Sequence, residues 1–469
     1  MGKKCCTADR NKNDGLGLSA CTGIIVGGCI GSAIFSLSGQ TIFYAGPASI
    51  ISWTVAAFVL ALYGMQVCEL ALRFPHSGGI FIFPKKALND RNGDFWAFVS
   101  AWGYIVSNIT AIAFSATAIG NFTGNGFGLS PEPFFTTPLF HIDITWTVLL
   151  AVIGIVFCLI LNLMKISDAG RLNNVLVAIL TLSMLIFAGF AFFGKRPDGT
   201  PAFTAVYFHD FFSTGMGVAG MFKAIPIAAV AFGSCVAISF MADEVKQPEK
   251  TIPMSLFVGI AAVTVLYLLM LIATIGTCNH DILVQLPFLQ FAPQFGSILN
   301  DGLTSYPALA KLIAIAAVLA LITTMLVLTA LNARAMQAVS ASGYLPEKFA
   351  QTNRNGVPSF SAVICSLIAV ILSLKPDIAS ILVNLGALLN VVSMTITCVS
   401  LIVARKKTKL PEGSYRAPFG DFSPLFTIAI LAVCYLVGNV TGAVAIFTFV
   451  IYTVGITVFF LQRKKSKIL

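Results

Sequence analysis

Charged residues are scarce in this sequence. Asp, Glu, Lys and Arg make up 10% of its 469 residues, whereas soluble domains average about 25%. The four histidines include no HExxH pair of a zinc hydrolase. The 11 cysteines have no metal-ligand spacing, so we expect them to behave as small apolar residues. These absences argue against an enzyme and against a resident metal or cofactor.

Long apolar runs take the place of charge. Hydrophobic residues make up 57% of the chain, in runs of about 20 residues that are long enough to cross a hydrocarbon core. We predict an all-α polytopic membrane protein embedded in the lipid bilayer. Its twelve expected spans are 16–44, 48–72, 95–122, 143–163, 172–194, 217–245, 254–278, 307–333, 358–375, 378–404, 422–440 and 442–461.

Basic residues are distributed unevenly between the loops. If both termini are cytoplasmic, the Lys and Arg residues outside or near outer helix ends are Lys195, Arg196, Lys223, Lys311 and Lys375. The other basic residues lie inside, which is a strong positive-inside pattern. The net charge of +10 therefore reflects topology and anionic lipid, not nucleic acid. We expect a multi-pass protein of the cell (plasma or inner) membrane with both termini cytoplasmic.

The first span contains a run of small residues, GGCIGSAIF at 27–35. Such a run suits a broken helix, whose freed N–H and C=O groups line a polar cavity in the membrane. It also suits close helix packing, because Gly23, Gly27 and Gly31 form a small-xxx-small stripe. Glycine alone does not decide between these interpretations.

The sixth span contains a second interruption, at residues 233–235 (Gly-Ser-Cys). Together with Pro226 it would also suit an ordinary helix kink. However, spans one and six are five apart, which is the spacing of paired broken helices in an inverted repeat of five plus five. Two matching interruptions favour that arrangement, with spans eleven and twelve outside the repeat.

Several short motifs resemble those of the amino acid–polyamine–organocation (APC) transporters. In chain order they are Gly31-Ser32-Ala33-Ile34-Phe35 (family GSGIF), Ala45-Gly46-Pro47, Glu69-Leu70 with Phe74-Pro75-His76-Ser77-Gly78-Gly79 (EL…FPxSGG), Glu244-Val245-Lys246-Gln247-Pro248 to Pro253, and Gly343-Tyr344-Leu345-Pro346 with Val357-Pro358. Each motif is weak by itself, but together they cover residues 16 to about 404 in order.

The resemblance implies a LeuT-like fold and the transport of amino acids across a membrane by alternating access. The units that it implies are a tail at 1–15, the first repeat at 16–200, the second at 217–404, a basic cytoplasmic connection at 405–421, the extra spans at 422–462 and a tail at 463–469.

The resemblance also implies a substrate site. The backbone of Gly31, Ser32, Ala33 and Ile34 would receive the substrate carboxylate, and carbonyls of the same break and of Phe232, Gly233 and Ser234 would receive its amino group. Phe232 matches an aromatic position that covers substrate. Asn108 matches a polar position of the pocket, although a hydrogen bond between helices would equally explain it.

Departures from the family pattern bear on substrate and coupling. Leu180 and Val236 stand where many members carry a Lys and an acid. No acid lies at mid-span, where charges mark function. We therefore expect a neutral amino acid, and favour small or apolar ones because Ile34, Phe35 and Phe232 would line the site. The alternatives are a polyamine or cationic amino acid exchanger, or an ion-coupled symporter.

Two further sets of residues are candidates for gating and ion binding. Glu69, Asp243 and Glu244 lie near cytoplasmic helix ends, where they would hold an inner gate or form surface pairs worth about 0–1 kcal/mol. A Na⁺ site would use Gly27, Thr323 and Thr324. Because threonines in membrane helices usually bond their own i−4 carbonyl, we expect an antiporter that exchanges substrates, ahead of H⁺ or Na⁺ coupling.

Overall fold

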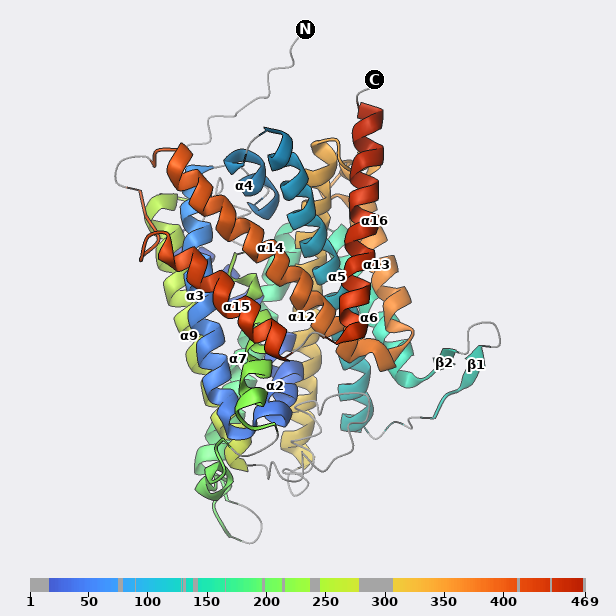
Figure 1. Ribbon diagram of the computed structural model, residues 1–469. Coiled ribbons are helices and arrows are strands. Elements are labelled where there is room, and N and C mark those ends of the chain that lie inside the picture. The colour runs from blue at the N-terminus through green and yellow to red at the C-terminus, as the bar shows by residue number, and fades with distance from the viewer. Residues whose placement is uncertain are drawn as a thin grey trace.

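The computed structural model describes residues 17–74, 79–88, 90–127, 129, 132–137, 142–164, 166–195, 199–212, 216–236, 245–277, 307–410, 414–438 and 441–466. The longer helices are α1 (Leu18–Cys29), α2 (Ser32–Ala45), α3 (Ser49–Arg73), α4 (Gly79–Ala87), α5 (Asp90–Phe127), α6 (Trp146–Leu163), α7 (Ile166–Phe193), α8 (Gly217–Val230), α9 (Pro248–Thr277), α12 (Pro307–Ala341), α13 (Ser359–Ser373), α14 (Ala379–Lys407), α15 (Phe422–Gly438) and α16 (Gly442–Ser466). They run roughly alongside one another in an elongated bundle (Figure 1).

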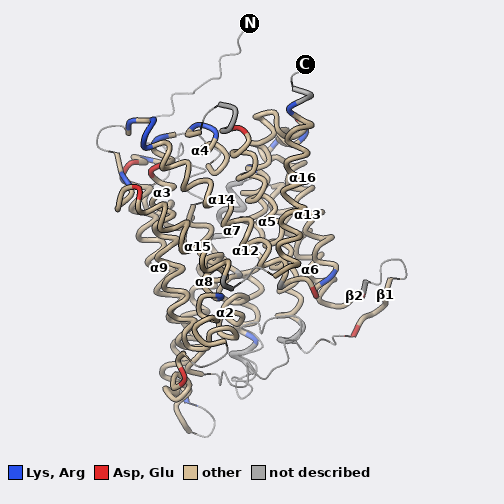
Figure 2. The backbone as a smooth tube through the Cα atoms, viewed as in Figure 1, with Lys and Arg blue, Asp and Glu red and all other residues tan. Residues whose placement is uncertain are grey.

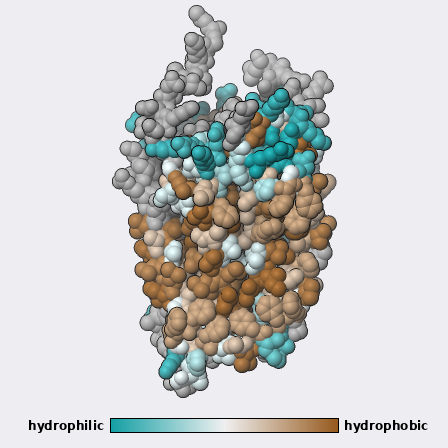
Figure 3. Space-filling view, turned by 90° about the vertical axis from the view of Figure 1, so that its left-hand side faces the viewer, coloured by the Kyte–Doolittle hydropathy of each residue, from teal (hydrophilic) through white to brown (hydrophobic). Residues whose placement is uncertain are grey.

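The bundle has the surface of a membrane protein. On the face that Figure 3 shows, hydrophobic side chains form a broad band across the middle, with hydrophilic ones towards the two ends. Within the described residues, nine helical segments are long and apolar enough to cross a membrane. One of these, Ala33–Arg73, joins α2 to α3 through the short 3-10 helix Gly46–Ala48. The polytopic membrane class is thus supported.

Three further helices, α1, α13 and α15, are apolar but shorter. The 15 residues of α13 extend about 22 Å at 1.5 Å per residue, which is less than the thickness of a hydrocarbon core of about 30 Å. The expected total of twelve spans therefore remains a prediction.

The expectation of an all-helical chain meets one exception. Strands β1 (Phe135–Thr137) and β2 (Ile142–Ile144) pair antiparallel, with Phe135 opposite Ile144. This small hairpin projects from the side of the bundle beyond the start of α6 (Figure 1). It lies in a connection between helices, so the transmembrane part stays helical.

The first span is broken where the glycines predicted it. The helix α1 ends at Cys29, and α2 begins at Ser32. Between them Gly31 adopts an extended conformation (φ −151°, ψ −144°). A Cβ atom at Gly31 would overlap the hydroxyl of Thr324 on α12. Gly31 therefore agrees with both interpretations of the small residues, because it lies at the helix break and also permits close packing against α12.

The sixth span also loses its α-helical form in mid-course. The helix α8 ends at Val230, and the backbone continues in tighter i→i+3 turns, with Phe232 N–H bonded to Ala229 C=O (3.1 Å) and Cys235 N–H to Phe232 C=O (3.0 Å). Such turns leave α-helical carbonyls without their usual partners. The two interruptions therefore both exist.

Helix α5 is the central support of the bundle. It packs along α12, α14 and α6, and its buried face includes Ala113, Ala116 and Ile112. The helices α1 and α3 both pack against α9, and α2 packs against α8. The helix α15 lies against α8, α3 and α14, so it joins the bundle closely although it was expected outside the repeat.

Charge is concentrated at one end of the molecule. Lys and Arg residues gather mainly at the end of the bundle where α16 finishes, and few occur along the middle of the helices (Figure 2). This distribution agrees with the positive-inside pattern of the sequence. It supports the placement of that end in the cytoplasm, which we propose below.

Candidate functional site

An internal cavity of about 90 Å³ lies between the two interruptions. Residues from the α1–α2 break, the end of α8, and helices α5, α12 and α14 form its wall. They are Gly28, Cys29, Ala33, Leu37, Tyr104, Ser107, Asn108, Thr110, Ala111, Phe114, Ser115, Val230, Ala231, Gly233, Ser234, Thr324, Leu328, Leu382, Val383, Gly386, Ala387 and Asn390. No charged side chain occurs among these described lining residues.

The start of α2 faces this cavity. Ala33, in the first turn of α2, lines it, and the residue that precedes the helix, Gly31, has no side chain with which to cap the first N–H groups. Uncapped N–H groups at a helix N-terminus, together with the helix dipole, form a binding site for anions. This end of α2 can therefore accept a carboxylate.

Other residues expected at the first break lie elsewhere. Ile34 is fully buried and does not line the cavity, and the same is true of Phe35. The side chain of Ser32 is not among those that the structure describes. Thus Ala33 is the expected first-break residue whose side chain meets the cavity.

The second interruption contributes Gly233 and Ser234, which both line the cavity. Phe232 does not, because its ring packs edge-on against Trp53 and Tyr267, with centroid separations of 6.2 and 5.4 Å. The expectation that Phe232 covers a ligand in the cavity therefore has no support in this conformation. Its ring instead joins the turns that follow α8 to α3 and α9.

One carbonyl at the end of α1 already has a partner. The hydroxyl of Tyr267 on α9 donates a hydrogen bond to the Cys29 carbonyl. The Phe232 carbonyl accepts from Cys235 N–H at 3.0 Å, and the Cys29 thiol lies 4.0 Å from it. A ligand ammonium must therefore use other carbonyls of the two breaks, or share these.

The opposite wall comes from α5 and α14. Asn108 lines the cavity and is 7% exposed. Tyr104 lies one helical turn before it, and Asn390 faces them from α14. The sequence pointed to Asn108 but not to Tyr104 or Asn390, because nothing in the local sequence says which polar residues of two distant spans will meet. The signal in the sequence that could have pointed to Asn390 is that it is a polar residue in the middle of an apolar span.

The candidate ion ligands are only partly brought together. The hydroxyls of Thr323 and Thr324 both donate to the Ala320 carbonyl, at 2.8 and 3.0 Å. Thr324 lines the cavity, whereas Thr323 is fully buried and does not. Gly27 is buried in α1 and is also absent from the lining. Both hydroxyls thus make the bonds to their own helix that we expected of threonine.

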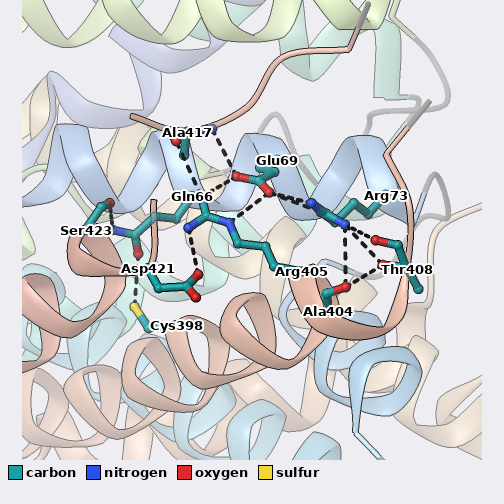
Figure 4. Close-up of polar contacts among 10 residues, drawn as sticks. All are labelled: Gln66, Glu69, Arg73, Cys398, Ala404, Arg405, Thr408, Ala417, Asp421 and Ser423. Carbon is teal, nitrogen blue, oxygen red and sulfur yellow. Dashed lines mark hydrogen bonds and ion pairs between the residues drawn. The ribbon is translucent and has the colours of Figure 1, made fainter. Parts of the chain in front are cut away.

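Glu69 lies in a polar cluster (Figure 4), and none of the residues drawn there lines the cavity. Its carboxylate accepts hydrogen bonds from Arg73 (2.8 Å) on its own helix, from Arg405 (2.5 Å) on α14 and from the backbone N–H of Ala417 (3.0 Å). The side chains of Glu69, Arg73 and Arg405 are 0%, 4% and 3% exposed. The alternative of a solvent-exposed surface pair therefore does not apply to Glu69.

Further bonds extend this cluster, which we call the α3–α14 clamp. Arg73 donates to the carbonyl of Thr408 (2.5 Å), just beyond the end of α14, and Arg405 contacts Asp421 (3.2 Å) before α15. One turn earlier on α3, Gln66 donates to Ser423 at 2.8 Å. The clamp thus joins α3 to both helices that flank the connection 405–421.

The remaining sequence predictions have mixed outcomes. Asp243 and Glu244 lie outside the described residues, as do residues 75–78 of the FPHSGG motif. Leu180 and Val236 are both buried apolar residues, so neither position supplies a titratable group.

Comparison with known proteins identifies relatives along nearly the whole chain. A family model described as amino acid permease matches residues 16–461. The branched-chain amino acid permease BcaP of Bacillus subtilis is 28% identical over 462 residues, which cover 94% of this chain and 92% of that protein. The methylthioribose transporter of Bacillus subtilis is 27% identical over 463 residues, which cover 95% of this chain and 92% of that protein.

A plant relative is similar over a smaller part of its length. Cationic amino acid transporter 7, chloroplastic, of Arabidopsis thaliana is 25% identical over 398 residues, which cover 81% of this chain and 63% of that protein. The resemblance to APC transporters is thus confirmed, and so is the expectation of a transporter in place of an enzyme. This chain belongs to the amino acid permease family of membrane transporters.

Proposed function

We propose that this permease is a secondary transporter that exchanges neutral amino acids across the cell membrane by alternating access. The observation that carries the proposal is the cavity between the two helix interruptions, which has no charged side chain among its described lining residues. A site between broken helices near the middle of the membrane is the arrangement by which secondary transporters bind small solutes.

The two ends of a zwitterionic amino acid would meet opposite partial charges. Its carboxylate would bind at the uncapped start of α2 near Ala33, and its ammonium at carbonyls near Gly233 and Ser234. The backbone of Gly31, Ser32 and Ile34 belongs to the same turn and would complete the carboxylate site.

The absence of charge from the described lining favours a neutral side chain. An arginine, lysine or polyamine substrate would need a carboxylate partner, since an unpaired charge is costly at this depth. The relatives do not decide the substrate, because their names include a branched-chain amino acid permease and a cationic amino acid transporter. The cavity is the reason to prefer a neutral amino acid.

Exchange agrees with the apolar residues at two positions of the described spans where many members of the family carry a titratable group. Leu180 and Val236 carry no proton, and the hydroxyls of Thr323 and Thr324 donate to Ala320. Substrate itself would then drive the return of the carrier. Na⁺ bound by Gly27, Thr323 and Thr324, or coupling to H⁺, is the alternative that the transport assay addresses.

We also propose the α3–α14 clamp as part of the inner gate, with Asp243 and Glu244 as further candidates. In the proposed topology its end of the bundle faces the cytoplasm, together with both termini and the connection 405–421. Twelve spans, arranged as repeats at 16–200 and 217–404 with an added pair at 422–462, complete the proposal.

Transport into proteoliposomes tests this function. We expect uptake of radiolabelled neutral amino acids to require unlabelled amino acid inside the vesicles, and to continue when Na⁺ is removed. Strong uptake into empty vesicles under an imposed Na⁺ or H⁺ gradient would show that the chain is a symporter. Preferential uptake of arginine or putrescine would contradict the neutral substrate class.

A further inference from the structure

Two hydrogen bonds determine how α5 and α14 lie against each other across the cavity wall. The Ser393 hydroxyl donates to the Ser100 carbonyl (2.7 Å), and the Ser107 hydroxyl donates to the Gly386 carbonyl (2.8 Å). As the residue number rises along α5, it falls along α14, so the helices are antiparallel. This register places Asn390 near the level of Tyr104.

The cavity therefore has two unlike ends along α5. At one end stand the side chains of Tyr104, Asn108 and Asn390. A Cβ atom at Gly233 would lie 3.8 Å from Nδ2 of Asn390, so this end also adjoins the second helix interruption. Farther along α5 the wall is mainly apolar. The apolar residues there are Ala111, Phe114, Leu382 and Val383, and the hydroxyl-bearing Thr110 and Ser115 line the same stretch.

The polar end contains an amide donor, Nδ2 of Asn108, that makes no hydrogen bond of normal geometry with the described residues. Asn108 is 7% exposed, and no described residue accepts a hydrogen bond of normal length from its Nδ2, although the Tyr104 hydroxyl interacts with its side chain. The nearby hydroxyls are engaged, since Ser107 donates to Gly386 (2.8 Å) and Thr110 to Ser107 (2.8 Å). The Nδ2 of Asn108, unlike these hydroxyls, has no such hydrogen bond.

This observation bears on the two explanations of Asn108. A hydrogen bond between helices would give its Nδ2 an acceptor on a neighbouring helix, and the described residues offer none. A buried donor without an acceptor is unfavourable until a ligand provides one. The apolar residues expected to select an aliphatic substrate, Ile34, Phe35 and Phe232, do not line the cavity.

We infer that the cavity selects neutral amino acids whose side chain carries a hydroxyl or an amide, with Asn108 as the residue that reads this group. The inference rests on the proposed function, because it places the substrate side chain in the cavity between the helix breaks. Asn390 and Tyr104 border the same end. An aliphatic side chain of equal shape would offer the Asn108 donor no acceptor.

Pairs of ligands with nearly the same shape isolate this effect. Threonine and valine differ by a hydroxyl in place of a methyl group, and asparagine and leucine by an amide in place of an isobutyl end. A site built to hydrogen-bond a substrate group discriminates strongly against the analogue that lacks it. We expect the purified full-length protein to bind threonine and asparagine at least about tenfold more tightly than valine and leucine.

Three variants assign the preference to Asn108. Asn108→Leu removes the donor and should reduce the threonine-to-valine ratio to about one. Asn108→Ser keeps a donor in a smaller side chain, so it should retain part of the threonine-to-valine ratio. It also provides a test if Asn108→Leu does not fold. Thr110→Val is the control within the same wall, because its hydroxyl is already bonded to Ser107. It should change both affinities by the same factor.

The outcomes separate this inference from the proposed function. Equal binding of threonine and valine by the unmodified protein would overturn the inference and leave amino acid transport in place. An unchanged preference in a folded Asn108→Leu protein would overturn the role of Asn108. Binding of none of the four amino acids would overturn the proposed function, and the inference with it.

Discussion

The cavity at the helix breaks and the α3–α14 clamp use polarity in opposite ways. The described wall of the cavity has no charged side chain, whereas the clamp buries a carboxylate between two guanidinium groups that are 4% and 3% exposed. In the cavity, helix ends and an amide provide partial charges. In the clamp, full charges join helices that are far apart in the sequence.

The difference shows where this chain can accommodate charge within a membrane. A buried ion pair repays the loss of its hydration only when hydrogen bonds saturate it, and Glu69 accepts such bonds from Arg73, Arg405 and Ala417. A cavity that must also exist without ligand has no such partners available. Partial charges suit it better, because they are less costly to leave open between substrates.

The largest effect should follow from filling the cavity. Ala33 lines it at the start of α2, so Ala33→Leu places three additional carbon atoms where we expect the substrate carboxylate. We predict loss of saturable amino acid binding, with a loss of stability of about 1–3 kcal/mol from overpacking. Binding to the purified protein and its thermal midpoint in detergent measure the two effects separately.

The matched control is Ala178→Leu, at an exposed position on α7. This variant makes the same chemical change on the outer surface, and we expect it to bind amino acids as the unmodified protein does. Normal affinity in a folded Ala33→Leu protein would contradict the proposed site. An equal loss of amino acid binding in both variants would indicate that the leucine substitutions destabilise the protein in general.

The second effect concerns the clamp. Glu69→Gln leaves Arg73 and Arg405 buried without their carboxylate, and breaking a buried pair in this way costs about 3–5 kcal/mol. We predict a clear fall in the thermal midpoint and slower exchange, with substrate affinity changed less than the rate. Glu249→Gln, the same change at an exposed position in the first turn of α9, should leave both unchanged.

Transport and stability together test the gate. If Glu69→Gln lowers stability but the folded fraction exchanges amino acids at the normal rate, the clamp is a structural support and the proposed gate is wrong. Restored exchange in a double variant that also removes the Arg405 charge would support coupling between the two residues.

Part of this arrangement was predictable from the sequence, because it depends on local backbone preferences. Gly31 and the cluster near Gly233 predicted interruptions, and both spans are interrupted there. The direction of a side chain was not predictable in this way. Phe232 lies beside the cavity, yet its ring packs against Trp53 and Tyr267, which belong to other helices.

Long-range pairing also lay beyond the sequence. The acidic residue Glu69 was recognised near a helix end, but its partner Arg405 is 336 residues away. Likewise, Asn390 becomes part of the cavity wall only through the antiparallel register of α5 and α14. A single sequence contains no direct record of such contacts, since they depend on how whole helices pack.

The smallest predicted effect lies at the exposed edge of the clamp. Asp421 contacts Arg405 at 3.2 Å, but its side chain is 48% exposed. Arg405 keeps its ion pair with Glu69 when the contact with Asp421 is removed. Exposed pairs contribute about 0–1 kcal/mol and weaken as salt screens them. We therefore expect Asp421→Asn to lower the thermal midpoint slightly at low salt and not measurably at high salt, while the deficit of Glu69→Gln persists in both. A loss as large as that of Glu69→Gln would mean that the clamp is one unit whose edge and centre contribute alike, and the distinction between buried and exposed charge drawn here would not hold.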